Sequence, residues 1–423
     1  MRSQVAGSRS REIVLIALLA LATNFTYFIA SNGDYTYPDS TTYLTPAQNL
    51  LQGRGYTGEL GFPETIRTPI YPLLLVPFIA TSTTLAPVVI AQHLINVALT
   101  IAIYWFARRR LNPFIARVAA IIFAIDVPTI HYANKVLTET LFAAGLFILF
   151  VLVITNAECR KQNAETSAFC ILPSAFLSGL LVLLRPLAIA YFAFIALFFP
   201  KRSIALFAAI SVALPIGWAI RNRIETGVLT ISSIAGVNML LHRAAGSLAM
   251  IDAGDFKQDL GDRQQELLDD ANDDLANQHH VDDAMDLDPA IRGAYYSQVG
   301  RRIALQHPAG LTLLVARGVL VNLFDSDWES IMIVSPLDSS LIRFALNAWT
   351  HCVIVFALIG VIVMWNRDRD LAMLIAITVV YFLLISAGGE SEARFRVPLM
   401  PQLAIAAAFG VDAIRRAASP APR

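Results

Sequence analysis

Long apolar stretches separated by short polar ones dominate the hydropathy pattern of this chain. A helix needs roughly 20 apolar residues to cross about 30 Å of hydrocarbon, and somewhat fewer where it is buried among other helices. About ten stretches meet this criterion. They are residues 13–30, 85–107, 112–128, 136–156, 168–184, 186–199, 203–220, 342–364, 371–387 and 397–414. The pattern therefore predicts an all-α, polytopic transmembrane helix bundle.

Two of these assignments have alternatives. The stretches 168–184 and 186–199 meet at Arg185–Pro186, where the proline could mark a turn between two spans or a kink inside one long helix. The stretch 13–30 follows basic residues as a signal peptide would. It lacks a small-residue cleavage site, so we interpret it as a retained first span.

Basic residues in short loops predict the orientation, because such loops stay in the cytoplasm. They fall on one side of the predicted bundle: Arg108, Arg109, Arg110, Arg160, Lys161, Lys201, Arg202, Arg415 and Arg416. We therefore expect a multi-pass protein of the inner (plasma) membrane with both termini cytoplasmic. Residues 31–84 then form a first extracytoplasmic loop carrying interfacial helices, and residues 221–341 form a second, larger helical loop. Within the second, residues 311–324 are expected to lie in the outer interface, because a span there would break the side assignment.

Composition supports the membrane assignment and excludes several function classes. The 423 residues are 56% hydrophobic and 15% charged, and the mean hydropathy is +0.58, far from the range of soluble proteins. Equal numbers of basic and acidic residues, 32 each, give no net charge to attract nucleic acid. No P-loop or dinucleotide-binding glycine pattern is present, and the acidic stretch 252–288 lacks calcium-loop spacing. A donor that arrives through the membrane fits this chain better than a soluble nucleotide.

The first outer loop contains a candidate general base. Asp39 follows Pro38, where a short helix with Tyr43 on its apolar face can begin. A carboxylate at that position can accept a proton from an acceptor hydroxyl or amine. The alternative is that Asp39 only caps the helix. Asp34 is a rival base, although the Gly33–Asp34 turn favours a loop role.

Two further segments carry candidate chemistry. In the segment 67–72, prolines fix the backbone around Arg67 at the membrane border, where its guanidinium can grip a lipid phosphate or contact ordinary headgroups. Glu139 lies at the outer end of an apolar helix, where a carboxylate is costly unless it faces a cavity or a partner. It could orient the acceptor or hold a metal, and the alternative is a helix-dipole or ion-pair role near Lys135.

More charged groups gather on the same outer face: Arg185, Arg221, Glu390, Glu392, Arg394 and Arg396. Arginines that converge beside a carboxylate pair suit a phosphodiester-like leaving group. Each arginine could instead be a snorkelling anchor at the interface.

The chain resembles the C superfamily of membrane glycosyltransferases, especially the branch of protein O-mannosyltransferases and bacterial aminoarabinose transferases. Short motifs in the family's order carry the resemblance: Asp39-x-x-x-Tyr43 with Ala47 and Gly53, Arg67 to Pro72, Leu137-Thr138-Glu139, Gly179 to Pro186, Arg221-Asn222 with Gly227, Gly236 and Asn238, His307-Pro308, and Glu392 to Pro398.

The resemblance implies an inverting transfer of a sugar from a polyprenyl-phosphate carrier to a lipid, glycan or protein acceptor. Asp39 matches the catalytic aspartate, and Glu139 the second acidic residue of the family. The arginines expected to bind the donor phosphate are Arg67, Arg221, Arg394 and Arg396. The residues expected around the acceptor cavity are Asp34, Tyr43, Tyr71, His131 and Lys135. Relatives can use a divalent metal, but no ligand set here predicts one, and no other cofactor is implied.

Three other functions fit parts of the pattern. Charged residues in a polytopic bundle also mark a transporter or flippase for a lipid-linked sugar, although here they cluster at one face and no inverted repeat is visible. A glycan polymerase or ligase would share the fold and use a longer donor. A non-catalytic scaffold would tolerate substitution at both Asp39 and Glu139.

Overall fold

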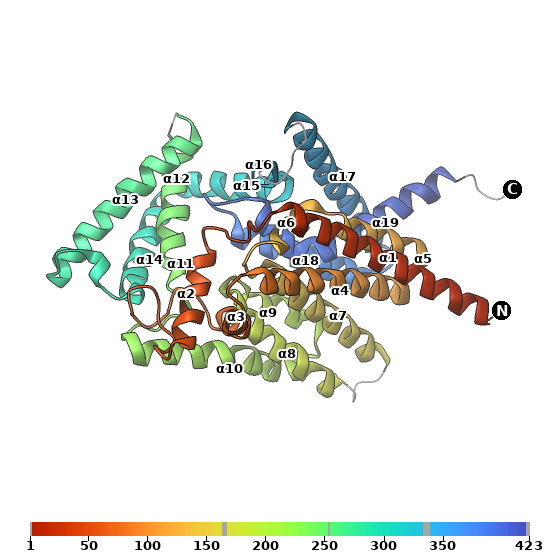
Figure 1. The fold of residues 1–423 in the computed structure, drawn as a ribbon, viewed down its shortest axis with the longest axis horizontal. Coiled ribbons are helices and arrows are strands. Elements are labelled where there is room, and N and C mark those ends of the chain that lie inside the picture. The colour runs from red at the N-terminus through yellow and green to blue at the C-terminus, as the bar shows by residue number, and fades with distance from the viewer. Residues whose placement is uncertain (1, 163–166, 253, 333–338, 420–423) are drawn as a thin grey trace.

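Helices carry the whole fold of the chain in its computed structural model (Figure 1). The structure describes the chain outside residues 1, 163–166, 253, 333–338 and 420–423, and it leaves out the side chains of residues 2–10, 159–162, 167–170 and 332. Arg160 and Lys161, two of the basic residues used to predict orientation, fall in that second group. Among the described residues the only β-bridge joins Thr57 to Pro63 in the first loop. The predicted all-α class is confirmed.

The bundle is built from helices that run along the long axis of the molecule. They are α1 (Arg2–Ala30), α4 (Ala86–Arg110), α5 (Pro113–Ala124), α6 (Val127–Ala133), α7 (Glu139–Gln162), α8 (Ser167–Leu184), α9 (Tyr191–Ile195), α10 (Lys201–Thr226), α17 (Ser339–Trp365), α18 (Arg369–Ser386) and α19 (Met400–Ala418).

The connecting segments form further helices at one end. These are α2 (Ser40–Leu51), α3 (Ile70–Thr81), α11 (Ile234–Val237), α12 (Ala245–Ala249), α13 (Phe256–His279), α14 (Pro289–Gln306), α15 (Pro308–Phe324) and α16 (Trp328–Met332). A π-helical segment, Asn238–Ala244, joins α11 to α12. Short 3₁₀ turns lie at Pro186–Ala188, Ala196–Phe198, Ala284–Asp286, Ala393–Phe395 and Val397–Leu399.

By length and composition, eight of the described helices can cross a membrane, or nine with the pair α5 and α6, which is bent by 54°. The bent pair corresponds to the predicted span 112–128. The predicted spans 168–184 and 186–199 appear as the shorter apolar helices Ile171–Leu184 and Pro186–Phe198, separated at Arg185. The other predicted spans each match one long helix. A polytopic bundle is therefore present, with fewer long spans than the ten expected.

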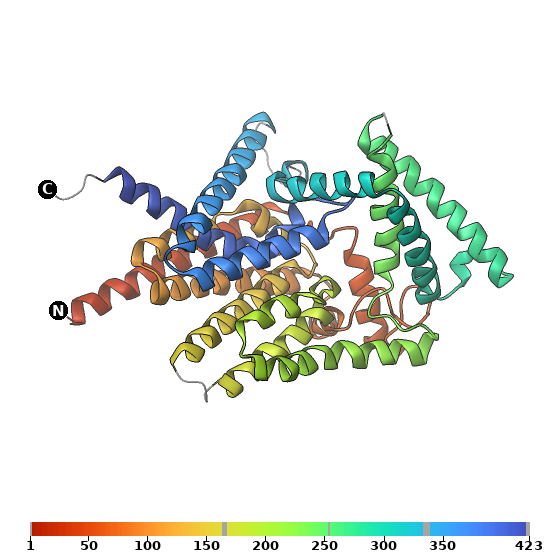
Figure 2. The same ribbon diagram turned by 180° about the vertical axis from the view of Figure 1, so that it is seen from behind.

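One further candidate span, Pro308–Ile331, contains the stretch 311–324 that we predict to lie in the interface. Asn322, near the end of α15, donates a hydrogen bond to the Ser386 hydroxyl at the end of α18 (3.1 Å). At the other end of α15, Gly310 packs against the backbone of Ser247 in α12. Thus α15 lies between α12, which its first turn contacts, and the end of α18, which its last turn contacts (Figures 1 and 2).

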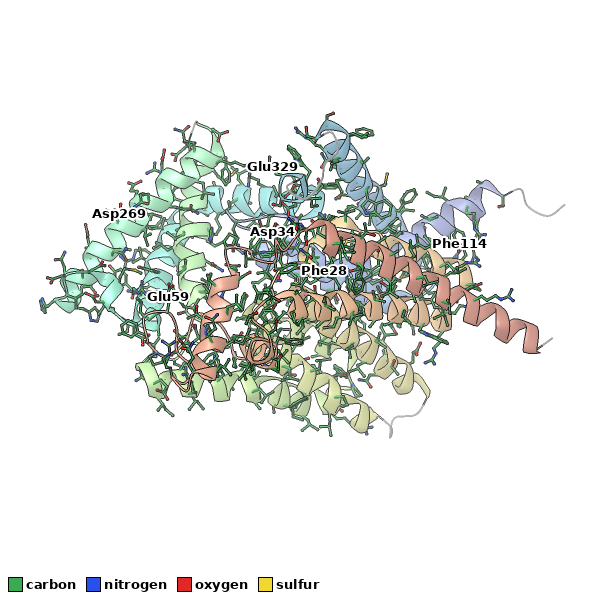
Figure 3. The ribbon with its side chains drawn as sticks, in the orientation of Figure 1. Phe28, Asp34, Glu59, Phe114, Asp269 and Glu329 are labelled. Carbon is green, nitrogen blue, oxygen red and sulfur yellow. The ribbon has the colours of Figure 1, made fainter. Side chains whose placement is uncertain are left out.

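The two ends of the bundle differ in character. Both termini lie at one end, and α2, α11, α13 and α14 lie at the other, which we call the loop end (Figure 1). Figure 3 shows Phe114, at the start of α5, near the termini, whereas Glu59 and Asp269 lie at the loop end. Buried α19 runs through the centre against α17. That both termini are cytoplasmic and the loop end is extracytoplasmic stays a prediction.

Candidate active site

A cavity of about 1160 Å³ extends along the loop-end side of α18. Its wall combines the start of α2, the chain before α3, the start of α7, the turn at Arg185, the π-helical segment, α14 and α18. Charged lining residues are Asp39, Arg67, Glu139, Arg185, His242, Arg243, Arg301, Glu390 and Arg394. Segments far apart in the sequence therefore bring ionisable groups into one space.

Asp39 is held in this cavity by two arginines. It occupies the N-cap position of α2, but its side chain makes no capping hydrogen bond. Instead, Oδ1 accepts a hydrogen bond from Nη2 of Arg67 and Oδ2 accepts one from Nη1 of Arg394, each at 2.8 Å. Asp39 is therefore at the capping position considered from the sequence, but its side chain does not cap the helix. The carboxylate itself faces the cationic groups.

Arg67 is fixed by the helix that follows Asp39. Its Nε donates to the Thr42 hydroxyl (2.7 Å), its Nη1 donates to the Tyr43 hydroxyl (3.2 Å), and the guanidinium lies 4.5 Å from the centre of the Tyr43 ring. Tyr43 packs edge-on against Tyr71, whose hydroxyl donates to Gln92 (2.7 Å). Tyr43, predicted for the acceptor cavity, both lines it and supports Arg67, whereas Tyr71 lies behind Tyr43.

Arg394 joins three carboxylates. Besides Asp39, its Nε lies 2.8 Å from Glu392 and 3.5 Å from Glu139. Glu139 is 2% exposed and is also paired with Nη1 of Arg185 at 3.1 Å. Its ion-pair partners are thus Arg185 and Arg394, not the nearby Lys135 considered from the sequence. Because charges this deeply buried need partners, the cluster is a single interdependent unit.

The electrostatics keep Asp39 ionised. Burial alone would raise the pKa of its carboxyl, but the guanidiniums of Arg67 and Arg394 outweigh burial and hold the pKa below its usual range. Glu392 is in the opposite state, because burial raises its pKa to about 7 even though Arg394 and Tyr37 act against the rise. Two carboxyl groups on one arginine therefore differ in proton affinity.

Several predicted site residues lie outside the cavity wall. Lys135 pairs with the Asp34 carboxylate at 2.7 Å, so each neutralises the other (Figure 3 labels Asp34). His131 shares a 2.6 Å hydrogen bond with the Tyr27 hydroxyl inside the bundle. None of these groups is among the cavity-lining residues. The rival base Asp34 is thus separated from the arginine cluster.

Two of the four arginines predicted to bind phosphate are also elsewhere. Arg221 donates to the carbonyl oxygens of Glu64 (2.9 Å) and Tyr56 (3.3 Å) and lies 5.0 Å from the centre of the Trp218 ring. Arg396, 2% exposed, donates to the carbonyl oxygens of three residues, namely Asn322, Leu323 and Asp325. Neither lines the cavity, and backbone carbonyls bind the guanidinium group of each. Arg67 and Arg394 remain.

The structure adds residues that the sequence did not assign to the site. Arg185 stood out only as one of several arginines at the outer face, and the break after α8 turns it toward Glu139. His242, Arg243 and Arg301 carried no motif. The π-helical segment that brings His242 and Arg243 to the cavity is not visible in the hydropathy pattern, so the sequence did not indicate their position.

No group of three or more His, Cys, Asp or Glu side chains that could hold a metal ion occurs among the described residues. Asp39, Glu139 and Glu392 converge, but each is bound to Arg394. The arrangement as it stands pairs these carboxylates with guanidinium groups.

Comparison with known proteins shows the fold. No protein-family model matches this chain, and neither does any curated protein. The apo oligosaccharyltransferase of Archaeoglobus fulgidus matches with a TM-score of 0.52 and 12% identity over 96% of this chain, and over 50% of its own. ArnT from Cupriavidus metallidurans bound to undecaprenyl phosphate matches with a TM-score of 0.37 and 12% identity, over 93% and 77% of the two chains. This chain therefore has the helical fold of the oligosaccharyltransferase and spans about half its length.

Proposed function

We propose that this protein is an inverting glycosyltransferase that moves a sugar from a polyprenyl-phosphate carrier to an acceptor bound at the loop end, outside the cytoplasm. A fold shared with an oligosaccharyltransferase supports sugar transfer, but a fold alone does not decide function. The observation that carries the proposal is the cavity itself. It places the Asp39 carboxylate together with the guanidiniums of Arg67, Arg185 and Arg394.

The shape of the cavity supports a lipid-linked donor. Beside the arginine cluster, part of its wall is apolar and includes Leu187, Phe194, Val380 and Leu384 from α9, α18 and the turn before α9. Phe194, Val380 and Leu384 are 45%, 53% and 49% exposed. An isoprenoid chain can cover such a surface and keep it from water. Its phosphate would then lie at the arginines.

The reaction follows from this placement. The acceptor hydroxyl or amine attacks the anomeric carbon, the bond from that carbon to the phosphate oxygen breaks, and polyprenyl phosphate leaves with the electron pair. Asp39 accepts the proton of the attacking group. Arg67 and Arg394 stabilise the charge that develops on the phosphate. As these guanidiniums turn from Asp39 to the phosphate, the carboxylate becomes more basic when a proton must be accepted.

Glu139 has a supporting role in this proposal. It holds Arg185 and Arg394 in place through Oε1. Its Oε2 is buried and has no hydrogen-bond partner among the described residues. That oxygen is available to orient an acceptor hydroxyl. A substitution at Glu139 should therefore impair both the arginine arrangement and acceptor binding.

The direct test uses purified protein in lipid nanodiscs with a polyprenyl-phosphate-linked sugar, and mass spectrometry of the released carrier. D39N should reduce turnover by at least about 10²-fold, the range of a lost general base, while its thermal unfolding stays like that of the wild type. D34N is the matched control, because Asp34 lies in the same loop, paired with Lys135. Its turnover should stay within a few-fold of wild type.

Three outcomes would contradict the proposal. D39N could retain turnover, which would remove the assigned base. The protein could move an intact lipid-linked sugar across a vesicle bilayer without breaking it, as a flippase does. The released carrier could be a diphosphate, which would indicate a polymerase or ligase.

A further inference from the structure

The same cavity has a second group of charged side chains, which the proposed reaction does not use. His242 and Arg243 come from the π-helical segment, Arg301 comes from α14, and Glu390 comes from the loop after α18. All four line the wall that also holds Asp39 and Arg67. We call this group the second polar end of the cavity.

The π-helical segment explains how these groups reach the cavity. A π-helix is wider than an α-helix, since its hydrogen bonds run from residue i to i+5, so residues four and five apart share a face. Asn238, Met239, His242 and Arg243 have this spacing, and all four line the cavity. Segments of this kind are rare and often occur at functional sites.

The segment is held against the end of α18 and the loop that follows it. The backbone N–H of Gly389 donates to the His242 carbonyl (3.1 Å), and Nη2 of Arg243 donates to the Ile385 carbonyl (2.8 Å). The His242 ring and the Glu390 carboxylate are 3.3 Å apart. The side chains of His242, Arg243 and Glu390 are therefore positioned before any ligand binds.

The charge at this end is not balanced locally. Arg243 makes its hydrogen bond to a neutral carbonyl, and neither it nor Arg301 forms an ion pair with a carboxylate within the described parts of the chain. Burial lowers the pKa of the Arg243 guanidinium, and the charge of Glu390 offsets only part of that effect. A partly desolvated cation without a carboxylate partner is stabilised when an anion binds.

We propose that the second polar end binds an anionic group of the acceptor, a phosphate or a carboxylate, through Arg243 and Arg301. This inference rests on the glycosyltransferase function proposed above. The donor phosphate belongs beside Asp39, because Arg67 and Arg394 are there. An anion on Arg243 and Arg301 is thus a separate group of the other substrate, and it anchors the acceptor while its nucleophile reaches Asp39.

The test measures binding, so it does not depend on turnover. The probes are inorganic phosphate in solution and phosphatidic acid in nanodiscs, with phosphatidylcholine nanodiscs as the neutral reference. R243Q, R301Q and the double variant should each weaken binding of at least one anionic probe by about tenfold or more, as expected for a lost charged hydrogen bond. R302Q is the matched control on the same helix, because Arg302 does not line the cavity. Its affinity should match the wild type.

The outcomes distinguish a lipid headgroup from a soluble anion, and they distinguish failure of the anion site from failure of the glycosyltransferase proposal. Binding of phosphatidic acid alone identifies a lipid headgroup, and binding of inorganic phosphate as well identifies a soluble anion; both support the site. Unchanged affinity for both probes in a folded R301Q variant and in the double variant would overturn it. If the variants lose the anion but no sugar leaves the carrier, the site stands and the glycosyltransferase proposal fails.

Discussion

At the scale of single residues, the site depends on how two guanidiniums divide their hydrogen bonds. Arg67 and Arg394 each donate to one oxygen of Asp39, and Arg394 also reaches Glu139 and Glu392. The proton affinity of Asp39 is therefore set by what else these arginines bind. This gives the carboxylate a low pKa when the cavity holds no other anion.

Removing one guanidinium should move the pH dependence of turnover. In R67Q the pKa of Asp39 should rise toward the ordinary range, because one of the two groups that lower it is gone. The acid limb of the kcat/KM profile should then shift to higher pH, in addition to an overall loss of rate. R54Q is the control, since Arg54 is an exposed residue of the same loop. If the acid limb of R67Q stays at the wild-type pH, the group that titrates there is not Asp39.

Glu64 should make stability depend on pH. Burial raises the pKa of this carboxyl to about 7, although the backbone N–H of Arg67 donates to it (2.7 Å). Because the folded-state pKa exceeds the unfolded value, stabilisation by the protonated form is complete below the unfolded value and is lost as pH rises through about 7. Glutamine at this position does not titrate. The free energy of unfolding of E64Q, relative to that of the wild type, should therefore rise by on the order of 2 kcal/mol between pH 5 and pH 8. E59Q, at an exposed residue of the loop (Figure 3), should show no such change.

Some of the site residues predicted from the sequence line the cavity and others do not, for a physical reason. Glu139 stands out because a carboxylate at the end of an apolar helix is costly without a function or a partner, and Asp39 because it begins a short helix in the outer loop. An arginine near the membrane border is ambiguous, since carbonyl groups, carboxylates and lipid phosphates all satisfy a guanidinium. Arg396 binds carbonyls and Arg394 binds carboxylates, two positions apart. Only the fold distinguishes them.

At the scale of elements, close backbone contact between α17 and α19 fixes the centre of the bundle. A Cβ atom at Gly360 would collide with the Ala406 carbonyl, and one at Gly410 with the Phe356 carbonyl. The two helices thus approach through glycine on both sides. Such small-residue contacts allow tight packing between apolar helices, where the hydrophobic effect adds little.

A single methyl group at this contact should destabilise the bundle. G360A should lower the free energy of unfolding by about 2 kcal/mol or more, because backbone must move to make room. G217A is the matched control, since nothing lies within 4 Å of a Cβ at that position of α10. Its effect should stay within about 1 kcal/mol. Thermal unfolding in one detergent measures both, and equal stability of the two variants would argue against the tight contact.

Hydropathy predicted the elements well where a span is one straight helix. It missed the bend inside 112–128 because the part of this run that contains the bend, residues 118–128, is apolar except at Asp126. That side chain caps α6 by accepting from the backbone N–H of Thr129 (3.1 Å), and Trp349 of α17 donates to it (3.0 Å). A single buried carboxylate with two partners ends one helix and starts the next. Periodicity alone does not report such a partner from a distant helix.

At the scale of the whole molecule, the two ends of the long axis carry different parts of the chain. The termini lie at one end and the cavity residues of α2, the π-helical segment and α14 at the other (Figure 1). The acidic stretch 252–288 contains α13, which lies on the outside of that loop end with Asp269 exposed (Figure 3). The cavity-lining elements of the loop end and the chain termini therefore lie at opposite ends of the molecule.

The predicted orientation can be tested with reporter fusions in a bacterial host. Green fluorescent protein fused after the C-terminus should fluoresce, because we place that end in the cytoplasm. Alkaline phosphatase fused after α13 should be active, because we place the loop end outside. The reverse pattern would leave the fold intact and put the cavity on the cytoplasmic face, against the proposed carrier chemistry.

The loop between α18 and α19 touches both polar ends of the cavity. Gly389 and Glu390 contact His242, whereas Glu392, a few residues on, shares Arg394 with Asp39. The same loop would therefore contact the residues that bind the donor phosphate and those that bind the acceptor anion. We expect binding at one position to change the affinity at the other. Any change in donor affinity caused by the acceptor must be matched by an equal change in acceptor affinity caused by the donor. The anionic groups of the two substrates would then influence each other's binding through the peptide chain, in addition to the contact between the reacting atoms.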